Sequence, residues 1–383
     1  MKGMNPVTAR TLKILAPTRY PWKFNGPRYS RHDISIRNFI PFNYISNKYE
    51  GITVFNPFPL RHFDLVHAFN RIPIGPHPFV IGFESHLPRG FGINQTAFFR
   101  QMRRALASDR CGAIIAISDH ARRQFLHQHA DTPEFDRLKA KLHLRYPNLP
   151  IADGPDPFKA DEAGEIRLVF IGNHFGRKGG SVAVQMADLA NQRGLPLRID
   201  IVSTIEVGAA SWTDPLSEGY FDQDRRRLAL PNIRHSQNLS NEAVLALVAQ
   251  AHFALLPTFS DTFGYSAIEA MSRYTPVVAT AQAALPEFIR DGDNGILLPL
   301  DVDDFGEWMR HIEQHDRTTP GYASLHRAEV NRLAELALDR VWAETRNPDK
   351  YLALRQNARA TAIAMFSAQD ANRFWDDFYL DYV

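Results

Sequence analysis

Short apolar runs alternate with longer amphipathic segments along the chain. In the first half the apolar runs are 12–16, 51–55, 65–69, 79–82 and 113–117, and helical patterns cover 94–108 and 119–128. The apolar runs are bounded by residues that break regular structure, which is typical of buried strands. Strands that alternate with helices predict an α/β domain built on a parallel sheet.

The second half repeats the alternation more clearly. Apolar runs at 166–171, 198–202, 253–257 and 276–280 predict strands, and the segments at 181–192, 241–249 and 265–272 predict helices. This pattern predicts a Rossmann-like domain. A polar insertion at 211–227 has no clear pattern. After residue 301 the chain is mostly helical, and it ends in an aromatic-rich segment, 366–382.

Length and local composition predict two domains. A chain of 383 residues corresponds to two domains at roughly 100 to 200 residues each. A stretch rich in Pro, Asp and Gly at 146–156 separates the halves and reads as a linker. We therefore predict an N-terminal domain over 1–157 and a second domain over 158–357, followed by a C-terminal helix over 358–383.

The overall composition is that of a soluble globular protein. Hydrophobic residues make up 44% and charged residues 22% of the chain, which excludes a disordered or fibrous protein. A single cysteine, Cys111, excludes a disulfide framework and a cluster of cysteine metal ligands. The first twenty residues do not resemble a signal peptide, and no apolar run approaches the roughly 18 residues of a membrane span. We expect a cytoplasmic protein.

The charge is divided unevenly between the halves. Residues 1–160 carry 23 Lys and Arg against 11 Asp and Glu, whereas the rest carries 21 against 31. The basic half either meets something anionic or complements its acidic partner domain. No recognisable nucleic-acid-binding module is present, so we expect no nucleic-acid partner. The candidate contacts to an anionic acceptor or membrane are Arg100, Arg103, Arg104, Arg122 and Arg123.

A glycine-rich loop follows the strand predicted at 166–171. It spans 172–180, contains four glycines and leads into a helix, so the backbone can approach a ligand closely and the helix N-terminus favours phosphate. Arg177 and Lys178 add full positive charges at the same place. The spacing is neither that of a Walker A motif nor that of the dinucleotide fingerprint. The alternative interpretation is that the glycines only turn the chain.

A second candidate loop follows the strand predicted at 253–257. It lies at the carboxyl end of a parallel strand, where open α/β sheets bind ligands. Asp261 in the loop and Glu269 in the next helix are eight residues apart, and carboxylates accept hydrogen bonds from sugar hydroxyls. An isolated pair with this spacing would be ordinary solvated surface. The amides available to an anion at the helix start are those of Phe263, Gly264 and Tyr265.

These two loops resemble the retaining glycosyltransferase family four. The resemblance covers 170–180 and 254–298, and the family pattern of Glu, seven residues and Glu is matched with Asp261 in the first place. It implies the GT-B fold, in which two Rossmann-like domains with parallel sheets face a cleft and a C-terminal helix crosses back to the first domain. The second domain would hold a nucleotide sugar and the first domain the acceptor.

The resemblance also implies roles for individual residues. Arg177 and Lys178 would bind the diphosphate, Glu269 the ribose, and Asp261 with the nearby amides the transferred sugar. Neither a metal nor a cofactor is expected. Gly26 matches a small-residue loop that approaches donor phosphates in this fold, although such a turn is common in any loop. The full donor-binding set is Gly26, Gly172, Asn173, Arg177, Lys178, Asp261, Thr262, Phe263, Gly264, Tyr265 and Glu269.

The sequence departs from the family in three places. Asn173 stands where many members have Arg, so contacts to the diphosphate are fewer or are shared with His174. Asp261 is one methylene shorter than the usual Glu, which fits a different donor sugar. Many relatives have a His at the end of the strand that here spans 79–83, where this chain has Glu84, with His86 two residues later. Either side chain could face the anomeric carbon, and Asp261 completes the candidate catalytic set.

The leading hypothesis is retaining transfer of a sugar from a nucleoside-diphosphate sugar to a hydroxyl of a glycan, a glycolipid or a small molecule. This activity would serve the synthesis of cell-surface polysaccharide or glycoconjugate. An anionic or lipid-linked acceptor would bring the protein to the inner face of a membrane as a peripheral protein. The alternatives are a sugar-nucleotide epimerase on the same fold and a catalytically silent subunit that binds nucleotide sugar.

Overall fold

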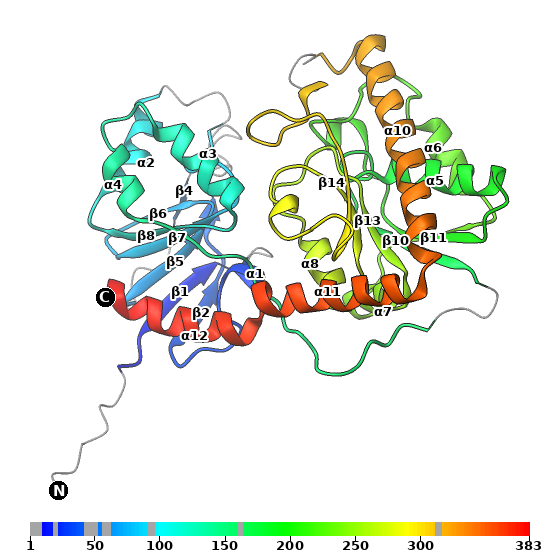
Figure 1. The fold of residues 1–383 in the computed structure, drawn as a ribbon. Helices are drawn as coiled ribbons and strands as arrows, with labels where there is room; N and C mark the ends of the chain where they lie inside the picture. The colour runs from blue at the N-terminus through cyan, green and yellow to red at the C-terminus, as the bar shows by residue number, and fades with distance from the viewer. Residues whose placement is uncertain are drawn as a thin grey trace, which may run out of the picture. The chain divides into compact units, whose positions relative to one another are not determined.

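The computed structural model of this chain divides into two compact units (Figure 1). Unit 1 comprises Met1–Pro150 and Phe366–Val383, and unit 2 comprises Ile151–Met365. None of the helices in the described part of the chain is long and apolar enough to cross a membrane. The residues that the structure describes are 10–17, 22–41, 53–55, 63–90, 96–159, 164–310 and 316–383.

Unit 1 is built on a six-stranded parallel sheet with the strand order β2-β1-β5-β7-β8-β9. The strands are β1 Lys13–Pro17, β2 Asp33–Arg37, β5 Leu65–Phe69, β7 Phe79–Phe83, β8 Cys111–Ala116 and β9 Leu142–Leu144. The helices are α1 Trp22–Asn25, α2 Ala97–Ala107, α3 Asp119–His129 and α4 Phe135–Ala140. A small second sheet contains β3 Ile40–Pro41, β4 Thr53–Phe55 and β6 Ile72–Ile74.

Alternate residues of these strands face two separate cores. Leu15 and Ile81 pack in the core that includes α2 and α3, whereas Ile14 and Val80 pack in a second core. This separation follows from the two-residue period of a strand. The second core is completed by the C-terminal helix α12, Ala368–Phe378, drawn in red on the other side of the sheet (Figure 1).

The C-terminal helix is anchored to unit 1 by a buried histidine. His67 in β5 is fully buried, and its Nδ1 lies 2.8 Å from the Tyr379 hydroxyl. The ring of Trp375 in α12 lies 4.5 Å from the imidazole. These contacts confirm that the C-terminal helix crosses back to the first domain. They give His67 a role in the core.

Unit 2 is built on a second six-stranded parallel sheet, with the strand order β12-β11-β10-β13-β14-β15. The strands are β10 Ile166–Ile171, β11 Leu197–Val202, β12 Ile233–Ser236, β13 Phe253–Leu256, β14 Val277–Thr280 and β15 Gly295–Leu298. The helices are α5 Gly180–Gln192, α6 Asp222–Arg227, α7 Asn241–Gln250, α8 Tyr265–Met271, α10 Pro320–Thr345 and α11 Pro348–Phe366.

The strand order of unit 2 reverses beside its first strand. The chain runs from β10 outward through β11 to β12, then returns to β13 on the other side of β10. Such a reversal leaves a crevice at the carboxyl ends of the two central strands, because the connections on either side diverge. The loops that follow β10 and β13 therefore leave the sheet next to one another.

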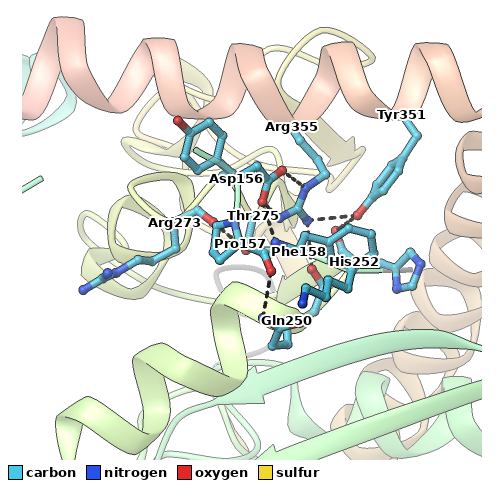
Figure 2. A network of polar contacts seen from close by, with 12 residues as sticks. Asp156, Pro157, Phe158, Gln250, His252, Arg273, Thr275, Tyr351 and Arg355 are labelled. Atoms are coloured by element: carbon cyan, nitrogen blue, oxygen red, sulfur yellow. Dashed lines mark hydrogen bonds and ion pairs between the residues drawn. The ribbon is translucent and has the colours of Figure 1, made fainter. Parts of the chain in front are cut away.

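The start of unit 2 is tied to α11 by a buried ion pair (Figure 2). The guanidinium of Arg355, with 1% of its side chain exposed, donates to both carboxylate oxygens of Asp156 at 2.6 and 2.7 Å. It also lies 4.2 Å from the ring centroid of Phe158, and the Tyr351 hydroxyl donates to the His252 carbonyl at 2.8 Å. The segment expected to be a linker is therefore fixed to unit 2 by Asp156.

Stability should depend on pH through His67. Burial lowers the pKa of His67 from its ordinary value of 6.5 to about 3. Between these values the unfolded chain binds a proton that the folded chain does not, so stability falls as the pH drops below 6.5. We expect His67→Gln to be less stable than wild type at pH 7.5, and the gap in unfolding free energy to narrow by about 2 kcal/mol at pH 5.

Urea unfolding of both proteins at the two pH values measures this gap. Tyr379→Phe is the control, because it removes the hydroxyl partner and leaves the imidazole to titrate. An equal gap at both pH values for His67→Gln would contradict a buried, neutral His67.

Candidate functional site

Two loops leave the sheet of unit 2 where its strand order reverses. We call residues 172–179, after β10, the β10 loop, and residues 257–264, after β13, the β13 loop. The strands pair directly, with Phe170 opposite Leu255. The sequence predicted both loops as ligand sites, and the topology places them at the position where doubly wound sheets bind ligands.

The two loops are joined by hydrogen bonds around one backbone carbonyl. The carbonyl oxygen of Arg177 accepts from the Phe259 amide at 2.8 Å and from the Thr258 hydroxyl at 2.9 Å. The Arg177 guanidinium in turn donates to the carbonyl of Ser260. Because Thr258, Phe259 and Ser260 are all buried, these bonds hold the loops as one rigid element.

Close packing explains one glycine of the β10 loop. Gly179 has a φ of +88°, and a Cβ atom there would lie 2.1 Å from the carbonyl oxygen of Pro257. Only glycine allows the backbones to approach so closely. Gly179 therefore has a packing role between the loops, in line with the alternative that these glycines shape the chain.

The two loops bring a lysine and an aspartate together. The Lys178 Nζ lies 2.7 Å from Oδ2 of Asp261, and the side chains are 21% and 12% exposed. Burial acts to raise the pKa of Asp261, but the charges of Lys178 and Arg177 and hydrogen bonds from Lys178 and the Phe263 amide outweigh it. The pKa therefore lies below its ordinary value of 3.8, and Asp261 is ionised at neutral pH.

Arg177 and Lys178 have different surroundings, although the sequence predicted one task for both. Arg177 is only 7% exposed, and its guanidinium lies 4.7 Å from the ring centroid of Trp212. Lys178 crosses Gly172, whose added Cβ would meet the lysine side chain at 2.8 Å, and it reaches Asp261. An ammonium has three N–H donors, and the contact with Asp261 uses one of them. Lys178 is the better placed of the two to meet an anion.

The start of α8 holds the remaining residues predicted from the second motif. Gly264 precedes the helix with a φ of +90°, and Thr262, Tyr265 and Glu269 are half-buried. Phe263 is buried, and its ring stacks on Phe288 with a centroid distance of 5.4 Å. The Phe263 amide, expected to bind ligand, hydrogen-bonds to Asp261.

The other end of the β10 loop is supported by the segment after β11. Asn173 is exposed, and its Oδ1 accepts from the Thr204 amide at 3.3 Å. The Glu206 amide donates to the Asn173 carbonyl at 2.8 Å, and a carboxylate oxygen of Glu206 lies 3.5 Å from His174. Burial, followed by the charge of Arg177, lowers the pKa of His174.

The polar insertion at 211–227 contributes two residues that sequence reasoning missed. Trp212 is 50% exposed, and its Nε1 donates to the Ser260 hydroxyl at 3.0 Å. Asp214 is fully buried beside Gly176, where an added Cβ would lie 2.4 Å from its carboxylate, and burial raises its pKa to about 6. The only indication in the sequence was the position of the insertion. It follows β11, and so it lies at the same edge of the sheet as the β10 and β13 loops.

Comparison with known sequences shows which family the region around this site resembles. Residues 165–315 match the family model described as Glycosyl transferases group 1. The site thus lies in the part of unit 2 that resembles this glycosyltransferase family.

Two curated glycosyltransferases are similar to this chain over short stretches. A D-inositol 3-phosphate glycosyltransferase of Mycobacterium sp. (strain KMS) is 36% identical over 95 residues, which are 25% of this chain and 21% of the relative. An MMP alpha-(1->4)-mannosyltransferase of Mycolicibacterium hassiacum is 41% identical over 80 residues, 20% of each chain. The match thus spans about a fifth of the length of these relatives.

Solved structures extend the likeness of fold to the whole chain. A glycosyltransferase from Rickettsia africae ESF-5 has a TM-score of 0.60 at 13% identity, covering 97% of this chain and 98% of that one. Anabaena HepE in complex with UDP-glucose has a TM-score of 0.56 at 13% identity, covering 96% and 99%. With the two parallel sheets, these likenesses confirm the predicted GT-B fold.

The residues predicted in unit 1 lie outside the range that matches the glycosyltransferase family model. One carboxylate oxygen of Glu84 accepts from Asn70 and from Arg89, both at 3.1 Å, so Glu84 holds the chain after β7 in place. His86 instead lines a pocket. A Cβ atom on Gly26 would lie 2.5 Å from the Trp22 ring, which shows that the glycine packs on this indole.

Loss of the Arg177 side chain should destabilise unit 2. Arg177→Met removes the donor to the buried Ser260 carbonyl and uncovers one face of Trp212, so we expect the free energy of unfolding to fall by about 2 kcal/mol. Arg193→Met is the control, because that side chain is 40% exposed and pairs with the exposed Asp339. Its effect should stay within about 0.5 kcal/mol.

Urea unfolding followed by circular dichroism measures both variants. If Arg177→Met lowered the free energy of unfolding no more than Arg193→Met does, the Arg177 guanidinium would not stabilise the contact between the two loops.

Proposed function

We propose that this protein is a retaining glycosyltransferase that moves a sugar from a nucleoside-diphosphate sugar to a hydroxyl of a glycan, glycolipid or small-molecule acceptor. The observation that carries the proposal is the Lys178–Asp261 pair, which lies at the strand-order reversal of a group 1 glycosyltransferase domain. The solved structure of HepE with UDP-glucose, which has the same fold, supports a nucleotide-sugar donor.

The pair presents opposite charges to the two parts of such a donor. The ammonium of Lys178 would meet the diphosphate, whose negative charge grows as the glycosidic bond breaks. A fixed cation at that position lowers the barrier by several kcal/mol, because it stabilises the transition state more than the ground state. The carboxylate of Asp261, ionised at neutral pH, would accept hydrogen bonds from hydroxyls of the transferred sugar. Glu269 in α8 would bind the ribose hydroxyls.

The rest of the donor set would act through the backbone and through one indole. Two further parts of the backbone would complete the diphosphate site without a metal or a cofactor. These are Gly172, which packs closely against the Lys178 side chain, and the amides of Gly264 and Tyr265. Trp212, held by Ser260 and Arg177, would offer its exposed surface to a ring of the nucleotide sugar.

The reaction would retain the anomeric configuration by attack on the face from which the diphosphate leaves, as the family resemblance implies. His86 is better placed than Glu84 to face the acceptor, because Glu84 is held by Asn70 and Arg89. The acceptor would bind in unit 1. The sugar transfer would serve the synthesis of cell-surface polysaccharide or glycoconjugate. We place the protein in the cytoplasm, at the inner membrane face if the acceptor is lipid-linked, with no nucleic-acid partner.

A thermal-shift panel of nucleotides and nucleotide sugars identifies the donor, since a ligand at 100 times its Kd adds about 2.7 kcal/mol of stability. NMR of the product with the donor so identified then reads the anomeric configuration. The proposal expects transfer with retention. Turnover of donor without acceptor would indicate an epimerase, and binding without turnover a silent subunit.

Donor binding should depend on Lys178. We expect Lys178→Ala to weaken UDP or GDP binding roughly 10- to 150-fold, because a hydrogen bond to a charged group contributes about 1.5–3 kcal/mol. Lys350→Ala is the matched control, since this lysine pairs with Glu344 on the same unit and is 53% exposed. Calorimetric titration of the three proteins measures the affinities. Equal affinity of wild type and Lys178→Ala would rule out the assigned diphosphate contact.

Trp212 should report donor binding directly. It is the most exposed of the five tryptophans, since Trp22, Trp308 and Trp375 are buried and Trp342 is half-buried. We expect a nucleoside diphosphate to quench the intrinsic fluorescence, and Trp212→Phe to abolish most of that change. Trp342→Phe is the control, because Trp342 also has an arginine over its ring, Arg346 at 5.0 Å. Undiminished quenching in Trp212→Phe would place the indole outside the site.

A further inference from the structure

A pocket of about 710 Å³ opens in unit 1 beyond the carboxyl end of β7. Its walls are the chain at 85–90, helix α2 and the C-terminal end of α3 with the turn that follows. The volume is within the range of about 300–1,000 Å³ that is typical of small-ligand sites. The position at the carboxyl edge of a parallel sheet is also that of ligand sites in open α/β folds.

One wall of the pocket is held in place by α3. The Gln128 side chain accepts from the Leu87 amide at 2.9 Å and donates to the Pro88 carbonyl at 2.9 Å. The buried His129 ring lies 2.8 Å from the Leu87 carbonyl. These three contacts fix the chain that carries His86 and Arg89, so the pocket is formed before any ligand arrives.

Three arginines line the pocket, against one aspartate, Asp131. Arg89 gives one N–H to Glu84 at 3.1 Å, and Arg103 gives its Nε–H to Glu134 at 2.8 Å. Glu84 and Glu134 are not among the pocket's lining residues, so they hold the guanidinium groups from behind. A guanidinium has five N–H donors in a fixed fork, and the fork matches the oxygens of a phosphate. The third arginine that lines the pocket is Arg100 in α2.

Two imidazoles share the same cavity. Loss of hydration, the charge of Arg89 and the neighbouring His127 lower the pKa of His86. A neutral imidazole can accept a hydrogen bond from a hydroxyl. The pocket thus holds donors for an anion and an acceptor for a hydroxyl within a single small-molecule volume.

We propose that this pocket binds the sugar acceptor by a phosphate group, which Arg89, Arg100 and Arg103 hold while the acceptor hydroxyl meets His86. The assignment rests on the proposed glycosyl transfer and names the chemistry of its second substrate. The phosphate belongs either to a soluble phosphorylated molecule or to a lipid headgroup, and both present the same group to the arginines.

The first experiment uses inorganic phosphate as the probe, titrated into the full chain by calorimetry. We expect Arg100→Gln and Arg103→Gln to weaken phosphate binding at least 10-fold, as charge-assisted contacts do. Arg104→Gln is the matched control. The sequence predicted Arg104 among the contacts to an anionic acceptor, but in the structure it lies on the same helix near the same Glu134, is 73% exposed and does not line the pocket. Its affinity should stay within about twofold of wild type.

Two further measurements distinguish binding in this pocket from binding at the proposed donor site. Lys178→Ala should retain the phosphate binding that Arg100→Gln loses, and UDP should bind equally to wild type, Arg100→Gln and Arg104→Gln. Phosphate binding that depends on Lys178 and not on Arg100 would overturn the pocket assignment. If UDP failed to bind wild type while phosphate binding still required Arg100, the donor proposal would fail and the anion site would stand.

Vesicle sedimentation distinguishes the two sources of the phosphate. Vesicles of phosphatidylcholine are compared with vesicles that also contain phosphatidic acid. Sedimentation that requires phosphatidic acid and is lost in Arg100→Gln, but not in Arg104→Gln, supports a lipid headgroup. Phosphate binding without sedimentation supports a soluble acceptor. If neither phosphate nor vesicle binding responds to Arg100 or Arg103, the proposal is wrong.

Discussion

The candidate donor site depends on the carbonyl oxygen of Arg177. This oxygen accepts hydrogen bonds from Thr258 and Phe259, and so it ties the loop after β10 to the loop after β13. The parallel sheet supplies the condition for this contact, because its strand order reverses between those two strands. Once the loops are joined, Lys178 and Asp261 are brought to a distance of 2.7 Å, although they are far apart in sequence. The positions of the charged side chains in the site thus follow from the backbone contacts between the two loops.

Each unit pairs carboxylates with cations, but the pairs have different roles in the two units. In unit 2, the cations outweigh burial, so Asp261 stays ionised beside Lys178. In unit 1, Glu84 and Glu134 lie behind Arg89 and Arg103 and hold those guanidinium groups toward the pocket. Burial of a charge is costly unless a partner of opposite charge compensates it. The pairs therefore position charged groups that a negatively charged ligand can meet.

Much of this arrangement could be predicted from the sequence, because the buried strands of a parallel sheet are continuous apolar runs. The strand at 166–171 was predicted with its observed bounds, and Lys178 and Asp261 were expected at the site. The edge strand Ile233–Ser236 was missed because it has one buried apolar residue, Ile233, and depends on pairing with β11. The separate surroundings of Arg177, and the approach of Trp212 to Ser260, follow from tertiary contacts that no local pattern encodes.

We expect a nucleoside diphosphate to bind where the strand order of unit 2 reverses. Hydrogen–deuterium exchange of the full chain, with and without UDP or GDP, tests it most directly. Binding should slow exchange both in peptides that cover 172–180 and in peptides that cover 257–265, because the two loops form one rigid element. If exchange slowed only in unit 1, or in neither loop when binding is saturated, the nucleoside diphosphate would not bind at this position.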